Sequence, residues 1–250
     1  MKPWLIVTAT ERGPRQDNDD RVIVSHWSHE CRRYYSVVVC DGIGSLVGSG
    51  GCATQTASLT MNALKDFVSS RESSRPFCVS DGSAFATQIT RTIARLHGSA
   101  KHGTTVAAAV FSYRSALVAW AGDSRIYALM KDGRLNQITT DHHDAQGHIA
   151  RFVRGDGLVS GGLQVRQLAM DKVVAIVGTT DGLHDSCSAE EFRDFIVYTL
   201  AGRTVDPSTL HAEVSAFLHS NIFDNTTIGL IYRPMSLRRA SNILRMNGSI

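Results

Sequence analysis

The 250-residue sequence contains no paired cysteine motif. Its five cysteines are scattered and none forms a C-x-x-C pair; they are Cys31, Cys40, Cys52, Cys78 and Cys187. An odd number of unclustered cysteines argues against both a disulfide framework and a zinc ribbon. We therefore expect most of them to act as small apolar residues.

Long apolar runs and a strong charge of one sign are also missing. No segment approaches the ~18 apolar residues that a membrane helix needs, and the apolar run in MKPWLIVTATERG is too short for a signal-peptide core. The formal net charge of +3 is too small to indicate nucleic acid as a partner. We expect a cytoplasmic protein with neither a membrane nor a nucleic-acid partner.

Strand patterns dominate the rest of the chain. Short runs rich in valine, isoleucine and aromatic residues predict strands at 4–8, 21–26, 34–40, 105–113, 116–120, 126–130, 173–177 and 227–232. Apolar residues at helical spacing predict helices over 53–68 and 85–96, and a capping box of Ser188 and Glu191 predicts another helix start. A fourth helix is expected near 210–217.

The order of these elements bears on the fold class. Strands come in clusters separated by helix pairs, which favours an α+β layered sandwich over a doubly wound parallel sheet. We predict one domain over residues 1–232. Residues 233–250, with four arginines, are expected to form a flexible basic tail rather than a docking or phosphorylation segment centred on Ser241.

The stretch VVVCDGIGSLVGSGG, residues 37–51, raises the question of a nucleotide cradle or a metal site. A dinucleotide fingerprint needs G-x-G-x-x-G and an acid about 20 residues later. Here Val47 stands where the third glycine belongs, and Asp66 falls inside a helical pattern. The fingerprint fails, which leaves Asp41 at the end of a buried strand, where a carboxylate is costly unless a cation neutralises it.

Aspartates recur where other strands meet loops. They are Asp19, Asp20, Asp41, Asp123, Asp181, Asp185 and Asp224, in the contexts DNDD, CDGIG, GDSR, TDGLHD and DNTT. Any one such site has a local explanation as a turn former, but five contexts together predict carboxylates that converge around cations.

Oxygen-only ligation favours Mg²⁺ or Mn²⁺ over zinc. Two such ions about 3.5 to 4 Å apart would hold a bridging water for attack on phosphorus. Arg15, in the loop before Asp19, offers a bidentate fork for a phosphate. The residues therefore predict phosphate-ester hydrolysis.

In their order, these motifs resemble the metal-dependent protein phosphatases of the type 2C, or PPM, family. The resemblance rests on GPRQDNDD, VVCDGIG, HGTTVAAAVF, AGDSRIYALMKDGRLNQITTDHH, VGTTDGLHD and FDNTTIGLIY, which span most of residues 8–232. It implies a four-layer αββα sandwich, with two central antiparallel sheets flanked by helix pairs, and a dinuclear Mn²⁺ or Mg²⁺ centre.

The resemblance also assigns roles to residues. Asp41 resembles the bridging ligand, Gly42 gives a backbone carbonyl, and Asp181 and Asp224 bind one ion. Asp20 contributes to the other ion through water, and Asp19 makes a water-mediated contact where the family usually has glutamate. Arg15 would bind the substrate phosphate, and Asp123 and Asp185 would hold a third ion. Thr104 and Thr105 are expected to be structural. Ser124 and Arg125 are expected to support Asp123.

Two departures from the family pattern stand out. Ile43 replaces a histidine that some members carry as a proposed general acid, although bacterial relatives often have an apolar residue there. The segment from Asp141 to Asp181 is short for the family's flap.

The resemblance at subfamily level is to bacterial stand-alone phosphatases that oppose Ser/Thr kinases and to those that regulate type VI secretion. The implied partners are phosphorylated Ser/Thr proteins, such as a cognate kinase or its substrates. The alternative is a catalytically weak, phosphatase-like module that binds a phosphoprotein or kinase without hydrolysis.

Overall fold

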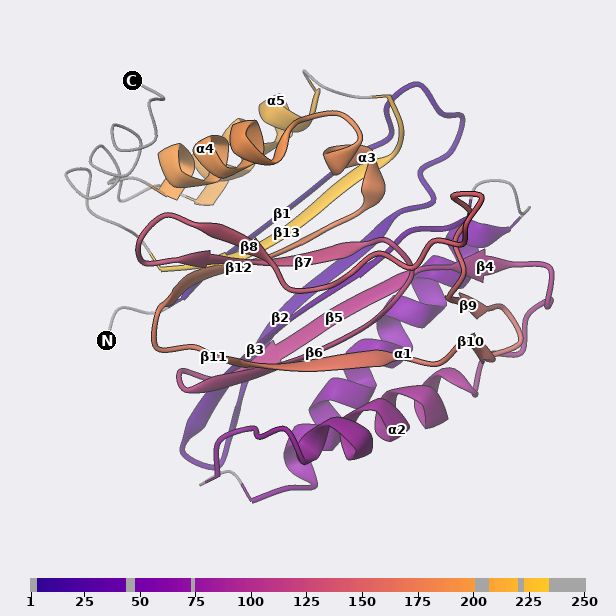
Figure 1. Cartoon of the computed structure of the whole chain (residues 1–250), viewed down its shortest axis with the longest axis horizontal. Helices are drawn as coiled ribbons and strands as arrows, with labels where there is room; N and C mark the ends of the chain where they lie inside the picture. The colour runs from indigo at the N-terminus through magenta and orange to yellow at the C-terminus, as the bar shows by residue number, and fades with distance from the viewer. Residues whose placement is uncertain (1–3, 44–47, 73–74, 201–206, 220–222, 234–250) are drawn as a thin grey trace.

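The protein is built around two antiparallel sheets packed face to face (Figure 1). The computed structural model describes residues 4–43, 48–72, 75–200, 207–219 and 223–233. One five-stranded sheet has the order β1 (Leu5–Glu11), β13 (Thr226–Tyr232), β12 (Val173–Thr179), β7 (Arg125–Met130), β8 (Leu135–Gln137). The other has the order β11 (Gln164–Ala169), β6 (Ser115–Ala121), β5 (Val106–Phe111), β3 (Arg32–Cys40), β2 (Arg21–His29).

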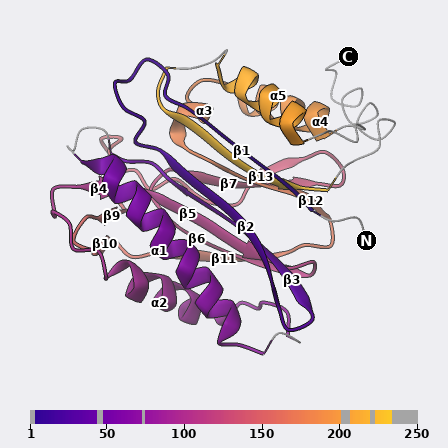
Figure 2. The same ribbon diagram turned by 180° about the vertical axis from the view of Figure 1, so that it is seen from behind.

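Helices cover the outer face of each sheet. Four of them are α1 (Ser49–Ser69), α2 (Asp81–Ile93), α4 (Ala189–Leu200) and α5 (Pro207–His219), and α3 (Asp181–His184) is a single turn after β12. Figures 1 and 2 show α4 and α5 on the sheet that contains β1 and β13, and α1 and α2 on the opposite side of the molecule. The predicted four-layer sandwich is confirmed. No helix in the described part of the chain combines the length and apolar character that crossing a bilayer requires.

The central strands are buried on both faces, which explains their unbroken apolar runs. In β3, Val37 and Val39 point between the two sheets, whereas Val38 and Cys40 pack under the helices. β5 alternates in the same way, with Ala107 among the residues between the sheets. Side chains on both faces of these strands therefore tie three layers together.

Two glycines allow the sheets to approach closely. Gly178 of β12 and Gly229 of β13 are direct register partners. A Cβ atom at Gly229 would lie 2.8 Å from a methyl group of Val37 in the other sheet, and one at Gly178 would lie 3.0 Å away from it. The space above Val37 is filled by backbone, so a larger residue would force the layers apart.

The predicted helical stripes lie where expected. Met61 and Leu64 of α1 and Phe85 and Ile89 of α2 belong to one apolar cluster beneath the sheet of β3. The capping box at α4 is present, with Glu191 accepting from the Ser188 amide at 2.9 Å and donating its own amide to Ser188 Oγ at 3.2 Å. Both α1 and α2 begin several residues before the predicted stripes, because small and polar residues form their first turns.

Several strands had no clear sequence signal. β11 lies at a sheet edge, and its sequence QVRQLA mixes polar and apolar residues without regular alternation. Three two- or three-residue strands form a separate small sheet in the order β10 (Val159–Ser160), β9 (Phe152–Arg154), β4 (Gly103–Thr104). The segment from Asp141 to Asp181, which is short for the family's flap, thus contains the β9–β10 hairpin. Residues 234–250 of the predicted tail lie outside the described residues, so the division at residue 233 stays a prediction.

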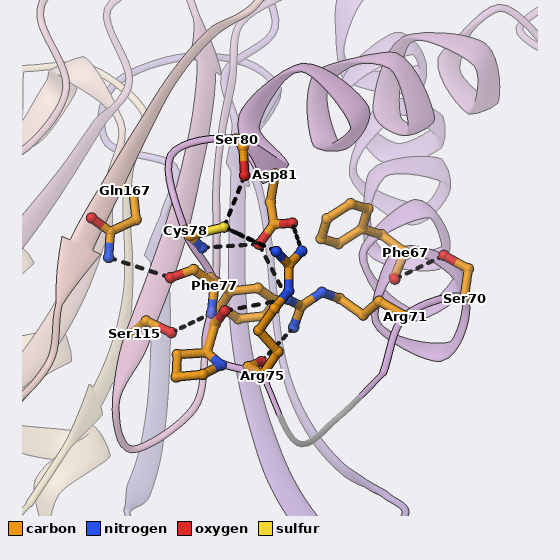
Figure 3. Close-up of polar contacts among 11 residues, drawn as sticks. Phe67, Ser70, Arg71, Arg75, Phe77, Cys78, Ser80, Asp81, Ser115 and Gln167 are labelled. Atoms are coloured by element: carbon orange, nitrogen blue, oxygen red, sulfur yellow. Dashed lines mark hydrogen bonds and ion pairs between the residues drawn. The ribbon is translucent and has the colours of Figure 1, made fainter.

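In the connection between α1 and α2, Asp81 forms ion pairs with two arginines, Arg71 and Arg75 (Figure 3). Asp81 accepts from Arg71 Nη2 at 3.1 Å and from the Cys78 amide at 2.9 Å, and it also pairs with Arg75. The Arg71 guanidinium lies 4.7 Å from the centroid of the Phe77 ring. The Arg71 and Asp81 side chains are only 10% and 9% exposed. Each side chain therefore neutralises the buried charge of the other.

We expect Asp81→Ala to lower the free energy of unfolding by about 3 kcal/mol, because it leaves the Arg71 charge buried without its partner. Urea denaturation followed by circular dichroism measures this. Asp132→Ala is the matched control, because Asp132 pairs with Arg134 at the surface and its loss should change little. Equal effects of the two substitutions would contradict the interpretation that Asp81 neutralises the buried charge of Arg71.

Candidate functional site

Asp41 is held at the end of β3 by its own backbone. Its amide donates to Thr105 Oγ1 at 2.9 Å, and its carbonyl accepts from the Thr105 amide and from Thr104 Oγ1, both at 2.8 Å. Thr105 Oγ1 in turn lies 2.7 Å from Ser124 Oγ. The structural roles predicted for Thr104 and Thr105 are therefore observed. The Asp41 carboxylate takes no part in holding this backbone and instead faces the carboxyl groups of Asp20 and Asp181.

A cavity of about 690 Å³ lies beside Asp41. Six predicted site residues line it: Arg15, Asp19, Asp41, Gly42, Asp181 and Asp224. Asp181 is the first residue of α3, directly beyond β12, and Asp224 lies just before β13. Pairing of β12 with β13 thus brings these two acids to the same edge of the sandwich.

Asp20 lies beneath this cavity rather than in its wall. It is 2% exposed, and its Oδ2 atom accepts from Thr180 Oγ1 at 2.7 Å. The other carboxylate atom, Oδ1, is buried without a hydrogen-bond partner. Burial raises the pKa of Asp20 to about 7, although the hydrogen bond from Thr180 acts to lower it.

The buried acids repel one another. Burial, followed by the charges of Asp20 and Asp181, raises the pKa of Asp41 well above its ordinary value. Burial is also the main reason why the pKa of Asp181 rises to about 6, and Asp123, Asp185 and Asp224 add to it. Such a group of like charges is relieved by protons or by cations.

The donor chemistry fits a hard divalent cation. All the side chains concerned offer carboxylate oxygens, and the buried Oδ1 atoms of Asp20 and Asp123 have no hydrogen-bond partner. Within the described residues, no three His, Cys, Asp or Glu side chains are already arranged as a metal cage. Ligation by each individual residue therefore stays a prediction.

Arg15 stands at the mouth of the same cavity. Its side chain is 53% exposed, and its guanidinium pairs with the Asp224 carboxylate. This is a cation on a loop of an otherwise acidic cavity, placed where an anionic substrate would enter. The remaining guanidinium donors are available to a phosphate.

The glycine run after Asp41 makes room for the neighbouring acid, Asp19. A Cβ atom at Gly50, in the first turn of α1, would lie 2.3 Å from Asp19 Oδ1, and one at Gly42 would lie 2.9 Å from Asp19 Cβ. The Gly42 amide also donates to the Asp19 carbonyl at 3.2 Å. These glycines therefore let the loop that carries Asp19 pack against the start of α1.

The two acids assigned to a third ion lie in a second cavity, of about 560 Å³. Asp123 and Asp185 line it, and Asp181 borders both cavities. Asp123 Oδ2 lies 3.0 Å from His143 Nε2. Ser124 Oγ contacts Thr105 and Arg125 binds Asp141, so the support of Asp123 by Ser124 and Arg125 stays a prediction.

Sequence reasoning missed the function of Asn225 within the DNTT motif. Its Nδ2 atom donates to the carbonyls of Arg12 and Asp17 at 2.7 and 3.0 Å, and its Oδ1 atom accepts from the Asp19 amide at 2.8 Å. Asn225 is buried, with 7% of its surface exposed. One amide side chain thus holds both ends of the loop that carries Arg15; nothing in the sequence links positions so far apart.

We expect the chelated protein to lose stability as the pH rises from about 4 to 7. Asp20 and Asp181 have pKa values of about 7 and 6 in the folded state, against ~3.9 when unfolded. In that window the folded state binds more protons, so the free energy of unfolding falls by about 1.4 kcal/mol for each unit of raised pKa that is titrated. Urea denaturation in EDTA across this pH range measures it.

Asp41→Asn is the companion variant, because it removes one buried charge and should flatten the pH dependence. Added Mn²⁺ should raise the melting temperature of the unmodified chain at pH 8. A pH-independent stability in EDTA would contradict the electrostatic picture.

Comparison with known proteins places this geometry in a family. The model of the protein phosphatase 2C family matches residues 11–219. Serine/threonine phosphatase Stp1 from Staphylococcus aureus has a similar structure, with 18% identity, coverage of 91% of this chain and 94% of that chain, and a TM-score of 0.68. No curated protein sequence matches the chain significantly.

Two further solved structures are similar. The Mycobacterium tuberculosis phosphatase PstP/Ppp has 18% identity, coverage of 94% and 100%, and a TM-score of 0.62. The catalytic domain of PstP in complex with two manganese ions has 18% identity, coverage of 92% and 98%, and a TM-score of 0.63. At such identities the likeness concerns the fold, whereas the family match covers most of the sequence. This chain belongs to the protein phosphatase 2C family, and its predicted class, protein serine/threonine phosphatase, is confirmed.

Proposed function

We propose that this phosphatase hydrolyses phosphoserine and phosphothreonine in proteins with two Mn²⁺ or Mg²⁺ ions. The observation that carries the proposal is the cluster of buried carboxylates around the first cavity, with Asp20 and Asp41 both carrying raised pKa values. A cluster of this kind fits cations that offset its charge. The two manganese ions in the PstP structure support the same choice of metal.

Each predicted ligand has a place in this proposal. Asp41, with the Gly42 carbonyl beside it, and Asp181 and Asp224, which line the same cavity, would hold the ions. Asp19 and Asp20 would act from the loop below, the latter with its unpartnered Oδ1. A third ion at Asp123 and Asp185 stays a prediction of the resemblance.

The ions would supply the Lewis acidity that lowers the pKa of an attacking water. The chain's own contribution is orientation. Arg15 would exchange its pairing with Asp224 for the phosphate, which offers two oxygens to a planar fork. Ile43 lines the cavity without a proton to give, so solvent would protonate the leaving alkoxide.

The proposed partners are phosphorylated proteins in a kinase-linked signalling pathway. The bacterial Ser/Thr phosphatases with a similar fold support this, and so does the exposed position of Arg15 at a cavity mouth. A cognate kinase, a cytoplasmic location and a link to type VI secretion stay predictions from the sequence.

We expect metal-dependent hydrolysis of an aryl phosphate and a phosphothreonine peptide, lost in EDTA and restored by Mn²⁺ or Mg²⁺. Asp181→Asn should lower kcat at least a hundredfold, because it removes a carboxylate from the cavity wall. Asp132→Asn, a surface control, should keep full activity. Metal binding by calorimetry without any turnover would instead support the phosphoprotein-binding alternative.

Asn225→Ala should raise KM about tenfold, with a smaller change in kcat, because the loop that presents Arg15 loses its anchor. Arg15→Ala should show the same pattern, and Asn136→Ala, on an exposed strand, should show none. Steady-state kinetics with the aryl phosphate measures the changes in KM and kcat separately. A uniform loss of activity that tracks a lowered melting temperature would mean that Asn225 only stabilises the fold.

A further inference from the structure

Two isoleucines differ from every other residue around the first cavity. Among the described residues that line it, Ile43 and Ile149 alone have apolar side chains, and the others are acids, amides, an arginine and a glycine. Both isoleucines also line the second cavity, so they lie between the two spaces. We call this pair the isoleucine wall. Its surface towards the first cavity does not depend on what the acids of the second cavity hold.

The isoleucine wall lies outside the core of the sandwich. Neither Ile43 nor Ile149 belongs to the three buried apolar clusters or to the partly buried side chains packed against them. Both side chains are partly exposed at the cavity. Apolar surface in contact with water gains free energy when another apolar group covers it. The isoleucine wall is therefore a surface that favours an apolar ligand.

The backbone of Ile43 is fixed on both sides. Its amide donates to the Gly103 carbonyl at 3.0 Å, and its carbonyl accepts from Ser49 Oγ at 2.9 Å. The preceding residue, Gly42, forms a β-bridge with Thr104 of β4. Ile43 is thus held between β4 and the first turn of α1, which lie beside each other in Figure 1.

A tight hairpin presents Ile149. His143 and Ile149 form a β-bridge, and the Asp144 amide donates to the His148 carbonyl at 2.8 Å. Asp144 Oδ1 also accepts from the amides of Gln146 and His148, both at 2.9 Å. The Asp144 side chain therefore closes the turn from which Ile149 emerges.

The base of this hairpin is tied to the core. The Ala150 amide donates to the His142 carbonyl at 2.7 Å, and the His142 amide donates to the Gly122 carbonyl at 3.2 Å. The Gly122 amide donates to His142 Nδ1 at 3.1 Å, and the His142 ring stacks on Trp120 with 6.0 Å between centroids. Both halves of the isoleucine wall are pre-organised, so a ligand that covers them loses little free energy in ordering the protein.

The occupant of the isoleucine wall follows from the rest of the cavity. Arg15 lines the same cavity, and a substrate whose phosphate lies there carries its neighbouring residues across the rim. A charged side chain would lose hydration against isoleucine, whereas an apolar one gains free energy. We propose that the isoleucine wall binds an apolar side chain next to the phosphorylated residue of the substrate. This inference rests on the proposed function, because that function brings a phosphorylated chain to the cavity.

The test uses phosphothreonine peptides in an alanine-rich sequence, with a single leucine moved through the flanking positions on either side. We expect one or two positions at which leucine raises kcat/KM about fivefold over alanine, because a partly buried aliphatic side chain gains about that much. Glutamate at the same positions should lower kcat/KM, since it would lie against isoleucine beside the acids of the cavity. A flat profile across all positions would overturn the inference.

Variants compare the leucine and alanine peptides within one protein, so a general loss of activity cancels from the ratio. Ile149→Ala should bring the leucine-to-alanine ratio close to one, and Ile149→Val should leave an intermediate ratio. Asp144→Ala, which removes two hydrogen bonds from the turn, should also lower the ratio. Leu158→Ala is the matched control and should keep the fivefold ratio, because Leu158 is an apolar residue that is 53% exposed and lines neither cavity.

Two further outcomes would overturn the inference. A leucine preference that survives Ile149→Ala would place the apolar contact elsewhere. Hydrolysis of the aryl phosphate by the unmodified protein is the separate readout of the proposed function, so hydrolysis with a flat peptide profile would overturn the subsite alone. No hydrolysis in either Mn²⁺ or Mg²⁺ would contradict the proposed function, and the subsite with it.

Discussion

Repulsion among buried carboxylates is the constraint around which this structure is organised. Asp20, Asp41 and Asp181 lie together at one edge of the sandwich, and burial raises the pKa of each. Their positions follow from the fold, because β3 and β12 end there and β2 begins there. The free energy lost by gathering these charges has to be recovered from packing elsewhere, and the two-sided burial of the central strands supplies it.

The acids are held in place largely through backbone groups and neutral side chains. Thr104 and Thr105 bind the main chain of Asp41, and Asn225 binds the main chain of the loop from Arg12 to Asp19. This division matters because a carboxylate used to fix its own position has fewer oxygens left for a ligand. The unpartnered Oδ1 atoms of Asp20 and Asp123 are what remains when neutral groups do the positioning.

Much of this arrangement could be predicted from local patterns. The apolar runs of β3, β5 and β12 and the stripe on α1 follow from periodicity, and the acids at strand ends predicted one shared site. β11 and the small β4–β9–β10 sheet could not be predicted, since they are short or polar and exist only through pairing with distant strands. The same holds for Asn225 and His143, whose importance lies in long-range contacts.

Position 43 links the chemistry of the two cavities. A histidine there would place a proton donor at the first cavity, whereas Ile43 presents an apolar wall to both. Without that donor, the proposed hydrolysis needs another source of the proton for the leaving alkoxide. Ile43 instead joins Ile149 in an apolar wall that the two cavities share, next to the carboxylate of Asp181. Position 43 therefore contributes an apolar surface, rather than a proton, to both cavities.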